Sequence, residues 1–104
     1  MGDKEIRITG PVLKVLQEFL QKPTDTLSGT DIAQHSKLKS GTLYPILMRL
    51  EEAEWLTSSW EDISPQEAGR PRRRLYRITG IGIRKAQAAY NEVLVPMGVP
   101  AWSM

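Results

Sequence analysis

The 104-residue sequence contains no cysteine, and this absence removes several classes of protein at once. Without thiols there is no disulfide framework, thiolate metal site or cysteine nucleophile. The single histidine, His35, has Lys39 rather than a metal ligand one helical turn later, and no glycine-rich phosphate loop or nucleophile elbow is present. A catalytic set could only be drawn from Ser28, Asp31 and His35, which are ordinary residues around a helix start. We therefore expect neither an enzyme nor a bound metal or cofactor.

Long apolar runs are missing as well. The longest, residues 93–102, contains Pro96 and Pro100 and is far too short to span a bilayer. The first residues, MGDKEIR, lack the apolar centre of a signal peptide. Charged residues at 25% and hydrophobic residues at 40% are typical of a soluble globular chain, and this length favours a small core helped by association. We expect a soluble, cytoplasmic protein.

The net charge is only +2, but its distribution is uneven. Five of the 14 cationic residues lie within eight positions: Arg70, Arg72, Arg73, Arg74 and Arg77. Half of the 12 acidic residues come just before them, between residues 51 and 67. A basic segment beside an acidic one creates an asymmetric electrostatic field.

The stretch 40–60 is the centre of the sequence. Its first part predicts a helix with one buried face, because apolar residues recur at i, i+3, i+4 and i+7: Leu43, Ile46, Leu47 and Leu50. The opposite face is mixed and carries Gly41, Thr42, Tyr44, Pro45 and Arg49. Pro45 lies about five residues into the helix, where it removes a backbone donor. Such a breach of local propensity tends to have a packing or functional reason.

Two further helices are predicted before this one. Thr9 and Pro11 suit the start of a helix whose apolar stripe is Val12, Val15, Leu16, Phe19 and Leu20. Residues 1–9 are predicted to form a loose arm with Ile6 and Ile8 free to dock on a partner. Ser28 and Asp31 resemble a capping box for a short second helix that ends near residues 35–36. A turn at 37–39 and a cap at Ser40 complete a helix-turn-helix.

Beyond Ala53 the pattern changes to strands. Residues 55–60 and 72–78 are β-prone, and in the second run Arg74, Tyr76 and Ile78 share one face. The polar connection between them contains Pro65, Gly69 and Pro71. The predicted fold is mainly α with a two-stranded β wing, a winged helix-turn-helix followed by a C-terminal dimerisation helix. Trp55 and Trp60 are assigned to packing in the core and at the base of the wing.

The stretches SGTLYPILMRLEEAEWLTSSWE and GRPRRRLYRIT resemble the PadR family of bacterial transcriptional regulators. Members of that family carry a TLYPxLxRLE helix and a wing that ends in a basic GRxRRxYxLT segment. The resemblance covers about residues 27–82. It implies a homodimeric DNA-binding repressor, often relieved by a small molecule or stress signal. The length resembles the short subfamily, which has a single C-terminal helix for dimerisation.

The resemblance places Thr42, Tyr44, Pro45 and Arg49 on a helix that enters the major groove. Hydroxyl and guanidinium groups reach phosphate oxygens or base edges, and a methyl group or ring contacts the thymine methyl. A phosphate is also within reach of the preceding turn and the helix N-terminus. Residues 69–71 are predicted to form an extended, narrow segment, and arginines of the wing are drawn to a narrow minor groove or to phosphates, although a solvated basic loop is the alternative. The predicted DNA-binding residues are Lys37, Lys39, Ser40, Gly41, Thr42, Tyr44, Pro45, Arg49, Arg70, Arg72, Arg73 and Arg74.

The C-terminal part is predicted to mediate dimerisation, so the chain divides into residues 1–79, which bind DNA, and residues 80–104, a dimerisation helix and tail. Thr79 caps the helix, Ala86 lies in its apolar stripe, and the predicted interface is Ile83, Tyr90, Val93, Leu94 and Met97. The Gly-Ile-Gly at 80–82 departs from the family pattern and predicts a loose first turn. Multidrug-binding relatives have a tryptophan where this helix has Tyr90 and Val93, which argues against a pocket for flat ligands. Trp102 packs across a dimer, marks an effector site or lies in a disordered tail.

These observations predict a sequence-specific regulator that is a homodimer, with one recognition helix in each of two successive major grooves, roughly 34 Å apart. It would act as a repressor on a near-palindromic operator, with an effector whose identity is unknown. The alternative function is a winged helix that binds protein or RNA, because the fold alone does not fix the partner.

Overall fold

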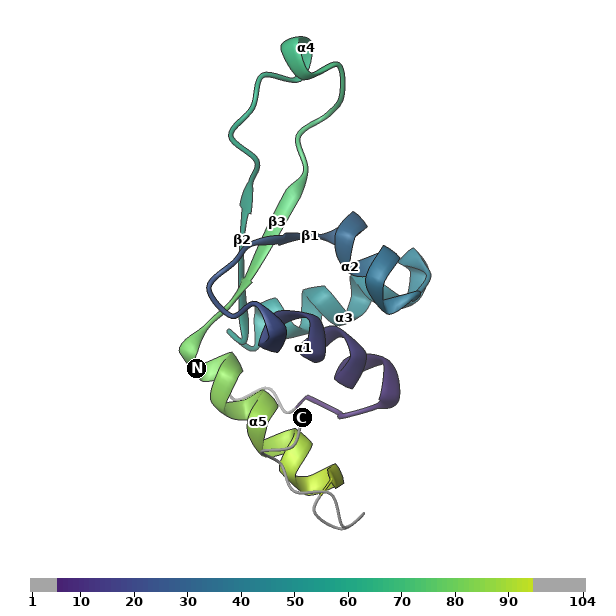
Figure 1. Ribbon diagram of the computed structural model, residues 1–104, viewed down its shortest axis with the longest axis vertical. Coiled ribbons are helices and arrows are strands. Elements are labelled where there is room, and N and C mark those ends of the chain that lie inside the picture. Colours follow the sequence, from purple (N-terminus) through teal and green to yellow (C-terminus); the bar gives the residue numbers. More distant parts are fainter. Residues whose placement is uncertain (1–5, 95–104) are drawn as a thin grey trace.

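A computed structural model describes residues 6–94, and for Leu94 the backbone only. Three helices form the body, a β-hairpin rises from it as the wing, and a last helix lies at the opposite end (Figure 1). The elements in chain order are α1 (Gly10–Gln21), β1 (Leu27–Ser28), α2 (Gly29–Ser36), α3 (Ser40–Glu52), β2 (Leu56–Trp60), α4 (Pro65–Ala68), β3 (Arg74–Ile78) and α5 (Gly80–Leu94).

The predicted helix starts are confirmed for α1, α2 and α5. Thr9 Oγ1 accepts from Val12 N at 3.3 Å, Ser28 Oγ accepts from Asp31 N at 3.1 Å, and Thr79 Oγ1 accepts from Gly82 N at 2.9 Å. The α3 start differs from the prediction. Ser40 is already helical, and the capping position belongs to Lys39, whose side chain makes no capping hydrogen bond.

The sheet has one strand more than the sequence predicted. The strand order is β1-β3-β2, all antiparallel, with β3 in the centre. β1 escaped prediction because it has only two residues, and its pairing partner β3 lies far along the chain. This short edge strand ties the start of α2 to the wing, so the wing and the helix-turn-helix share one sheet.

The core lies between α1, α3 and the sheet, and α5 covers one side of it. All four predicted core residues of α3 are buried, as are Phe19, Ile32 and Trp55. On β3, Tyr76 and Ile78 are buried and Arg77 is exposed, so the predicted alternation of the strand is confirmed. Ile6 and Ile8 are half-buried against this same core. Part of their apolar surface is thus covered within the chain, and docking of the rest on a partner stays a prediction.

The first turn of α5 is tight, which corrects the prediction of a loose start. Thr79 Oγ1 donates to Glu54 O at 2.7 Å, and Thr79 N donates to Trp55 O at 2.9 Å. Gly82 is buried where the helix meets the body: a Cβ there would overlap the Trp55 carbonyl oxygen and lie 2.8 Å from Ile78 Cγ1. Glycine is required at this position for close approach, and it lets α5 begin directly after the wing.

Candidate nucleic-acid interface

The exposed side of α3 divides into a middle and two flanks. Helical spacing puts Thr42 and Arg49 on one flank and Tyr44 and Glu51 on the other, because members of each pair are two turns apart. Between them lie Gly41, Pro45 and Met48, and the Met48 side chain is 58% exposed. Sequence reasoning missed Met48, although its spacing from Tyr44 and Pro45 places it on the same face. The helix thus presents small and apolar groups with Arg49 at one edge, and the acidic Glu51 and Glu52 at its C-terminal end.

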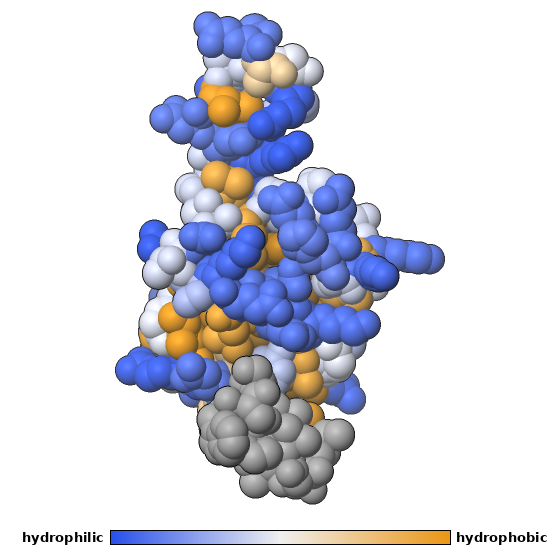
Figure 2. All heavy atoms as spheres, in the orientation of Figure 1, coloured by the Kyte–Doolittle hydropathy of each residue, from blue (hydrophilic) through white to orange (hydrophobic). Residues whose placement is uncertain are grey.

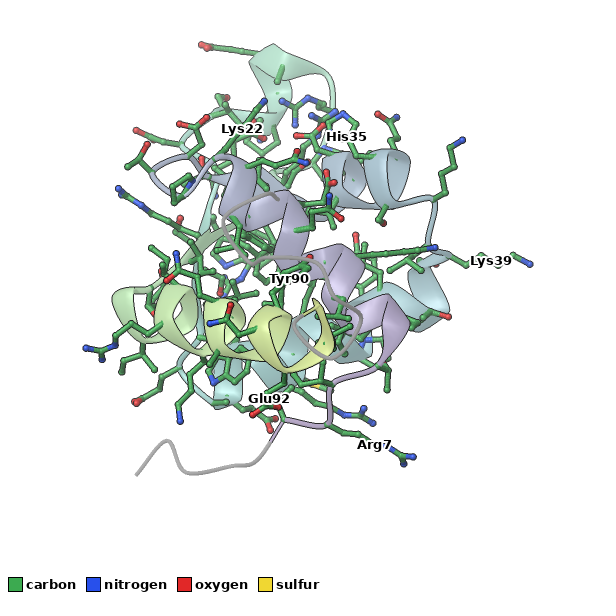
Figure 3. The ribbon with its side chains drawn as sticks, turned by 60° about the horizontal axis from the view of Figure 1, so that its bottom comes forward. Arg7, Lys22, His35, Lys39, Tyr90 and Glu92 are labelled. Atoms are coloured by element: carbon green, nitrogen blue, oxygen red, sulfur yellow. The ribbon has the colours of Figure 1, made fainter. Side chains whose placement is uncertain are left out.

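The turn before α3 is held by a buried serine. Ser36 Oγ donates to Ile32 O at 2.6 Å and accepts from Leu38 N at 3.3 Å, and Lys37 adopts a left-handed conformation with φ of 61°. Both Lys37 and Lys39 are exposed, and Lys39 projects away from the body (Figure 3). Thr42 N and Leu43 N bond back to Lys39 O, each at 2.9 Å. These bonds use the Thr42 and Leu43 amides, so the amides left at the helix end beside the two cations are those of Ser40 and Gly41, where an anion can bind.

Tyr44 is half-exposed, and its ring lies in the space left by the missing side chain of Gly29. Its side chain is 45% exposed, and a Cβ on Gly29 would lie 2.6 Å from the Tyr44 hydroxyl oxygen. The absence of a side chain at Gly29 allows the ring to lie on the first turn of α2. Tyr44 therefore lies against α2 and keeps part of its ring open to solvent.

The arginines of the wing differ in their surroundings. Arg70 donates two hydrogen bonds to the Glu61 carboxylate, at 2.7 and 3.0 Å, and Arg73 N donates to the same carboxylate at 3.2 Å. The Arg70 guanidinium, followed by the Arg73 amide and charge, lowers the pKa of Glu61 from 4.5 to about 2. α4 ends at Gly69 with φ of 69°, so the segment 69–71 is bent rather than extended as predicted. The Glu61 carboxylate therefore holds Arg70 and the Arg73 amide together at the tip of the wing, and we call this set of contacts the Glu61 clamp.

The other wing arginines are more open to solvent. Arg72 Nε donates to Ile63 O at 2.9 Å, and both Arg72 and Arg73 are exposed, as is Arg77 on the outer face of β3. Figure 2 shows hydrophilic residues over most of the wing. Arg74 is placed differently, with its guanidinium carbon 4.8 Å from the centroid of the Trp60 ring and Nη2 4.0 Å from Glu51 Oε2. The wing cations therefore comprise two engaged members, Arg70 at the tip and Arg74 near α3, and three exposed ones, Arg72, Arg73 and Arg77.

Trp60 does not pack in the base of the wing as predicted, because 63% of its side chain is exposed. Trp55, by contrast, is buried in the core, as expected. The Glu61 clamp and the short helix α4 were also absent from the sequence prediction. The only sequence signals for them are Pro65 and Gly69, which match the helix start and the left-handed cap.

Of the five residues predicted at a dimer interface, Tyr90 has a role within its own chain. Its hydroxyl donates to Leu13 O at 2.7 Å, its side chain is buried between α5 and α1, and burial raises its pKa (Figure 3). Ile83 and Val93 are half-buried. The side chain of Leu94 and all of Met97, together with Trp102, lie outside the described residues.

The part of the chain that the structure describes contains no cluster of metal-ligating side chains. No three His, Asp or Glu side chains of residues 6–94 lie close enough together to hold a metal ion.

A cavity of about 420 Å³ lies beside α3 and is lined by Ile6, Arg7, Val12, Ile46, Arg49, Leu50 and Glu52. Every helix within residues 6–94 is too short or too polar to cross a membrane.

Comparison with known proteins agrees with this arrangement. Residues 28–88, more than half of the chain, match the transcriptional regulator PadR-like family. No curated protein sequence matches the chain. A structure of smu.1704 from Streptococcus mutans is similar at 27% identity and a TM-score of 0.68, over 89% of this chain and 87% of that one.

Two other solved structures share the fold. A PadR family transcriptional regulator from Eggerthella lenta has 22% identity and a TM-score of 0.66, over 81% of this chain and 74% of that one. A complex of S. aureus MepR with DNA has 21% identity and a TM-score of 0.65, over 88% of this chain and 68% of that one. The chain spans only 56% of a disulfide-formed AbfR that it also resembles. By its sequence match and its winged helix-turn-helix, the chain belongs to the PadR-like family of transcriptional regulators.

Proposed function

We propose that this protein is a homodimeric repressor that binds a near-palindromic duplex operator. Residues 1–79 supply the DNA contacts and residues 80–104 join two copies. One α3 would enter each of two major grooves roughly 34 Å apart. A signal acting at the dimer interface would relieve repression by changing the distance between the two helices.

One observation carries this proposal: the exposed flank of α3 and the arginine-bearing wing border the same corner of the molecule. Glu51 on that flank accepts a hydrogen bond from Ser58 of β2 and lies 4.0 Å from Arg74 of β3. A duplex that meets α3 with its major groove would therefore also meet the wing. The similarity to a MepR chain that was solved in complex with DNA supports duplex DNA as the partner.

The chemistry of the two surfaces fits different tasks. Thr42, Tyr44, Pro45 and Arg49, with Ser40 and Gly41 at the helix start, offer groups for base edges and phosphates. Lys37, Lys39, Arg72 and Arg73 are exposed cations that suit phosphates alone. Arg70 and Arg74, already engaged by Glu61 and Trp60, would act by shaping the wing more than by direct contact.

Titration of genomic duplex fragments at two salt concentrations tests the proposal. We expect specific fragments to bind more tightly than random duplex, with affinity falling steeply as salt rises. Replacing Arg72 and Arg73 together by alanine should weaken both kinds of duplex and flatten the salt slope by up to about two. Tyr44→Ala should weaken the operator more than random duplex.

Arg84→Ala provides the matched control, because Arg84 is exposed and belongs to α5, the helix at the opposite end of the molecule from the wing (Figure 1). It should leave both affinities close to those of the unchanged protein. If no fragment is preferred, or if affinity does not respond to salt, the proposal fails. Preference for single-stranded RNA or for a protein would favour the alternative function.

A further inference from the structure

Trp60 is the most exposed large apolar side chain of the described residues, and it lies at a defined place. It ends β2 directly opposite Arg74 of β3, and the two side chains meet as a ring and a guanidinium 4.8 Å apart. Ser58, two residues earlier and so on the same face of β2, donates a hydrogen bond to Glu51 of α3. The Trp60 ring therefore lies on the face of the wing that meets α3, two residues beyond the contact that Ser58 makes with Glu51.

We propose that Trp60 contacts the sugar-phosphate backbone of the DNA strand that runs between the major groove holding α3 and the minor groove reached by the wing. This inference rests on the proposed function, since it needs α3 and the wing to bind one duplex. A backbone that passes from one groove to the next must cross the corner between α3 and the wing. Trp60 stands in that corner, and on α3 the exposed Tyr44 and Met48 lie along the same side of the helix as Glu51, which contacts the wing.

The surroundings of the ring suit a deoxyribose with a phosphate beside it. Trp60 borders a shallow hollow of about 850 Å³ whose other walls are Glu61, Asp62, Pro65, Pro71 and Arg72. The two proline rings and the indole give an apolar floor for the sugar, and Arg72 gives a cation for the phosphate. The negative charge of Glu61 is already balanced by Arg70, which leaves Asp62 as the acidic group at this edge.

Arg74 prepares the ring for this contact. Its guanidinium lies over the indole, where the cation is attracted by the ring electrons and limits the rotamers that Trp60 can adopt. A fixed aromatic ring loses little conformational freedom on binding, and the neighbouring cation adds attraction to a polyanion. Because deoxyribose and phosphate are the same for every base, the contact should add affinity without adding sequence preference.

The first test compares Trp60→Ala and Trp60→Phe with the unchanged full-length protein, using operator and random duplexes at one salt concentration. We expect Trp60→Ala to weaken both duplexes by about tenfold, with an unchanged ratio between them. Trp60→Phe should retain most of the affinity. Circular dichroism and sedimentation should show that both variants fold and assemble normally, because the replaced side chain is exposed.

The second test follows Trp60 directly by fluorescence. Trp55 is buried, so Trp102→Phe leaves Trp60 as the accessible emitter. We expect bound duplex to protect this fluorescence from quenching by acrylamide. The control variant with both Trp60→Phe and Trp102→Phe should show weak quenching with and without DNA.

The outcomes separate this inference from the proposed function. If the unchanged protein binds no duplex, both are overturned. If it binds duplex while Trp60→Ala binds equally well and DNA gives no protection, only the role of Trp60 is overturned. A loss confined to the operator would also overturn it, since that result would make Trp60 a reader of bases. So would a loss of assembly in Trp60→Ala, which would place the ring at a protein interface.

Discussion

Gly82 lies where α5 leaves the wing, and its missing side chain sets how closely that helix approaches the body. A Cβ at this position would overlap the Trp55 carbonyl oxygen and crowd Ile78 Cγ1 at 2.8 Å. The carbonyl cannot retreat easily, because it accepts a hydrogen bond from Thr79 N at 2.9 Å. Gly80, in the same turn, has nothing within 4 Å of the equivalent point.

The pair of glycines gives a prediction with an internal control. Gly82→Ala should destabilise the protein by about 2 kcal/mol, because overpacking a tight contact forces the backbone to shift. For a domain of this size, the Tm should fall by roughly 10 °C in a thermal melt followed by circular dichroism. Gly80→Ala should be neutral or slightly stabilising, since alanine favours a helix and meets no neighbour. Equal melting temperatures for the two variants would contradict the close approach.

The wing is an element whose strands are held by its tip as well as by its ladder. β2 and β3 pair from Leu56 and Ile78 as far as Trp60 and Arg74, and Glu61 N then donates to Arg73 O at 2.9 Å. Beyond that point the Glu61 carboxylate holds both Arg70 and the Arg73 amide. One acidic residue therefore connects the two sides of a twelve-residue excursion from 62 to 73.

Glu61→Gln should loosen the tip without unfolding the body. A neutral amide binds Arg70 less strongly than a carboxylate does, so trypsin should cut after Arg72 and Arg73 several times faster than in the unchanged protein. Glu67→Gln removes the same charge from exposed α4 and should leave the cutting rate unchanged. Similar rates in both variants would show that charge alone, and not the clamp, controls the tip.

The clamp also has a defined pH range. Arg70 lowers the folded-state pKa of Glu61 from 4.5 to about 2. The stabilisation that this contact gives the folded state is therefore complete above pH 4.5 and is lost as the pH falls toward 2. Trypsin is active well above this pH range, so the proteolysis experiment is carried out with Glu61 charged and the clamp formed. A titration of the Glu61 carboxyl carbon by nuclear magnetic resonance should find its midpoint near 2, and Arg70→Gln should raise it toward 4.5.

Elements were predictable from the sequence where their signals are local. Thr9 and Ser28 sit at caps beside an apolar stripe, so α1 and α2 could be placed from neighbouring residues alone. β1 and the Glu61 clamp depend on partners far along the chain, and no local pattern shows which carboxylate will meet which arginine. The same limit explains Trp60, because no local pattern shows whether the last side chain of a strand will be covered by another element.

At the scale of the whole molecule, α5 packs against the body over most of its length, but its last described side chains are only partly covered or exposed. Ala86, Ala89 and Tyr90 are buried, whereas Val93, one turn further along the same stripe, is only half-buried. The division of the chain at residue 79 therefore stays a prediction about function, because α5 shares its core with α1. Val93 thus keeps part of its apolar side chain open, and a second copy would cover it.

Val93→Glu should weaken the proposed dimer while leaving the protomer folded. A carboxylate at this half-buried position would be desolvated by a second copy, which should raise the dissociation constant about 100-fold or more in sedimentation experiments. Gln87→Glu adds the same charge at an exposed position of α5 and should leave assembly unchanged. Tyr90→Phe should cost about 1 kcal/mol of stability by removing the bond to Leu13 O, without changing assembly. If Val93→Glu remained a dimer, or if Tyr90→Phe became a monomer, the partner surface would lie elsewhere than at this overhanging end of the stripe.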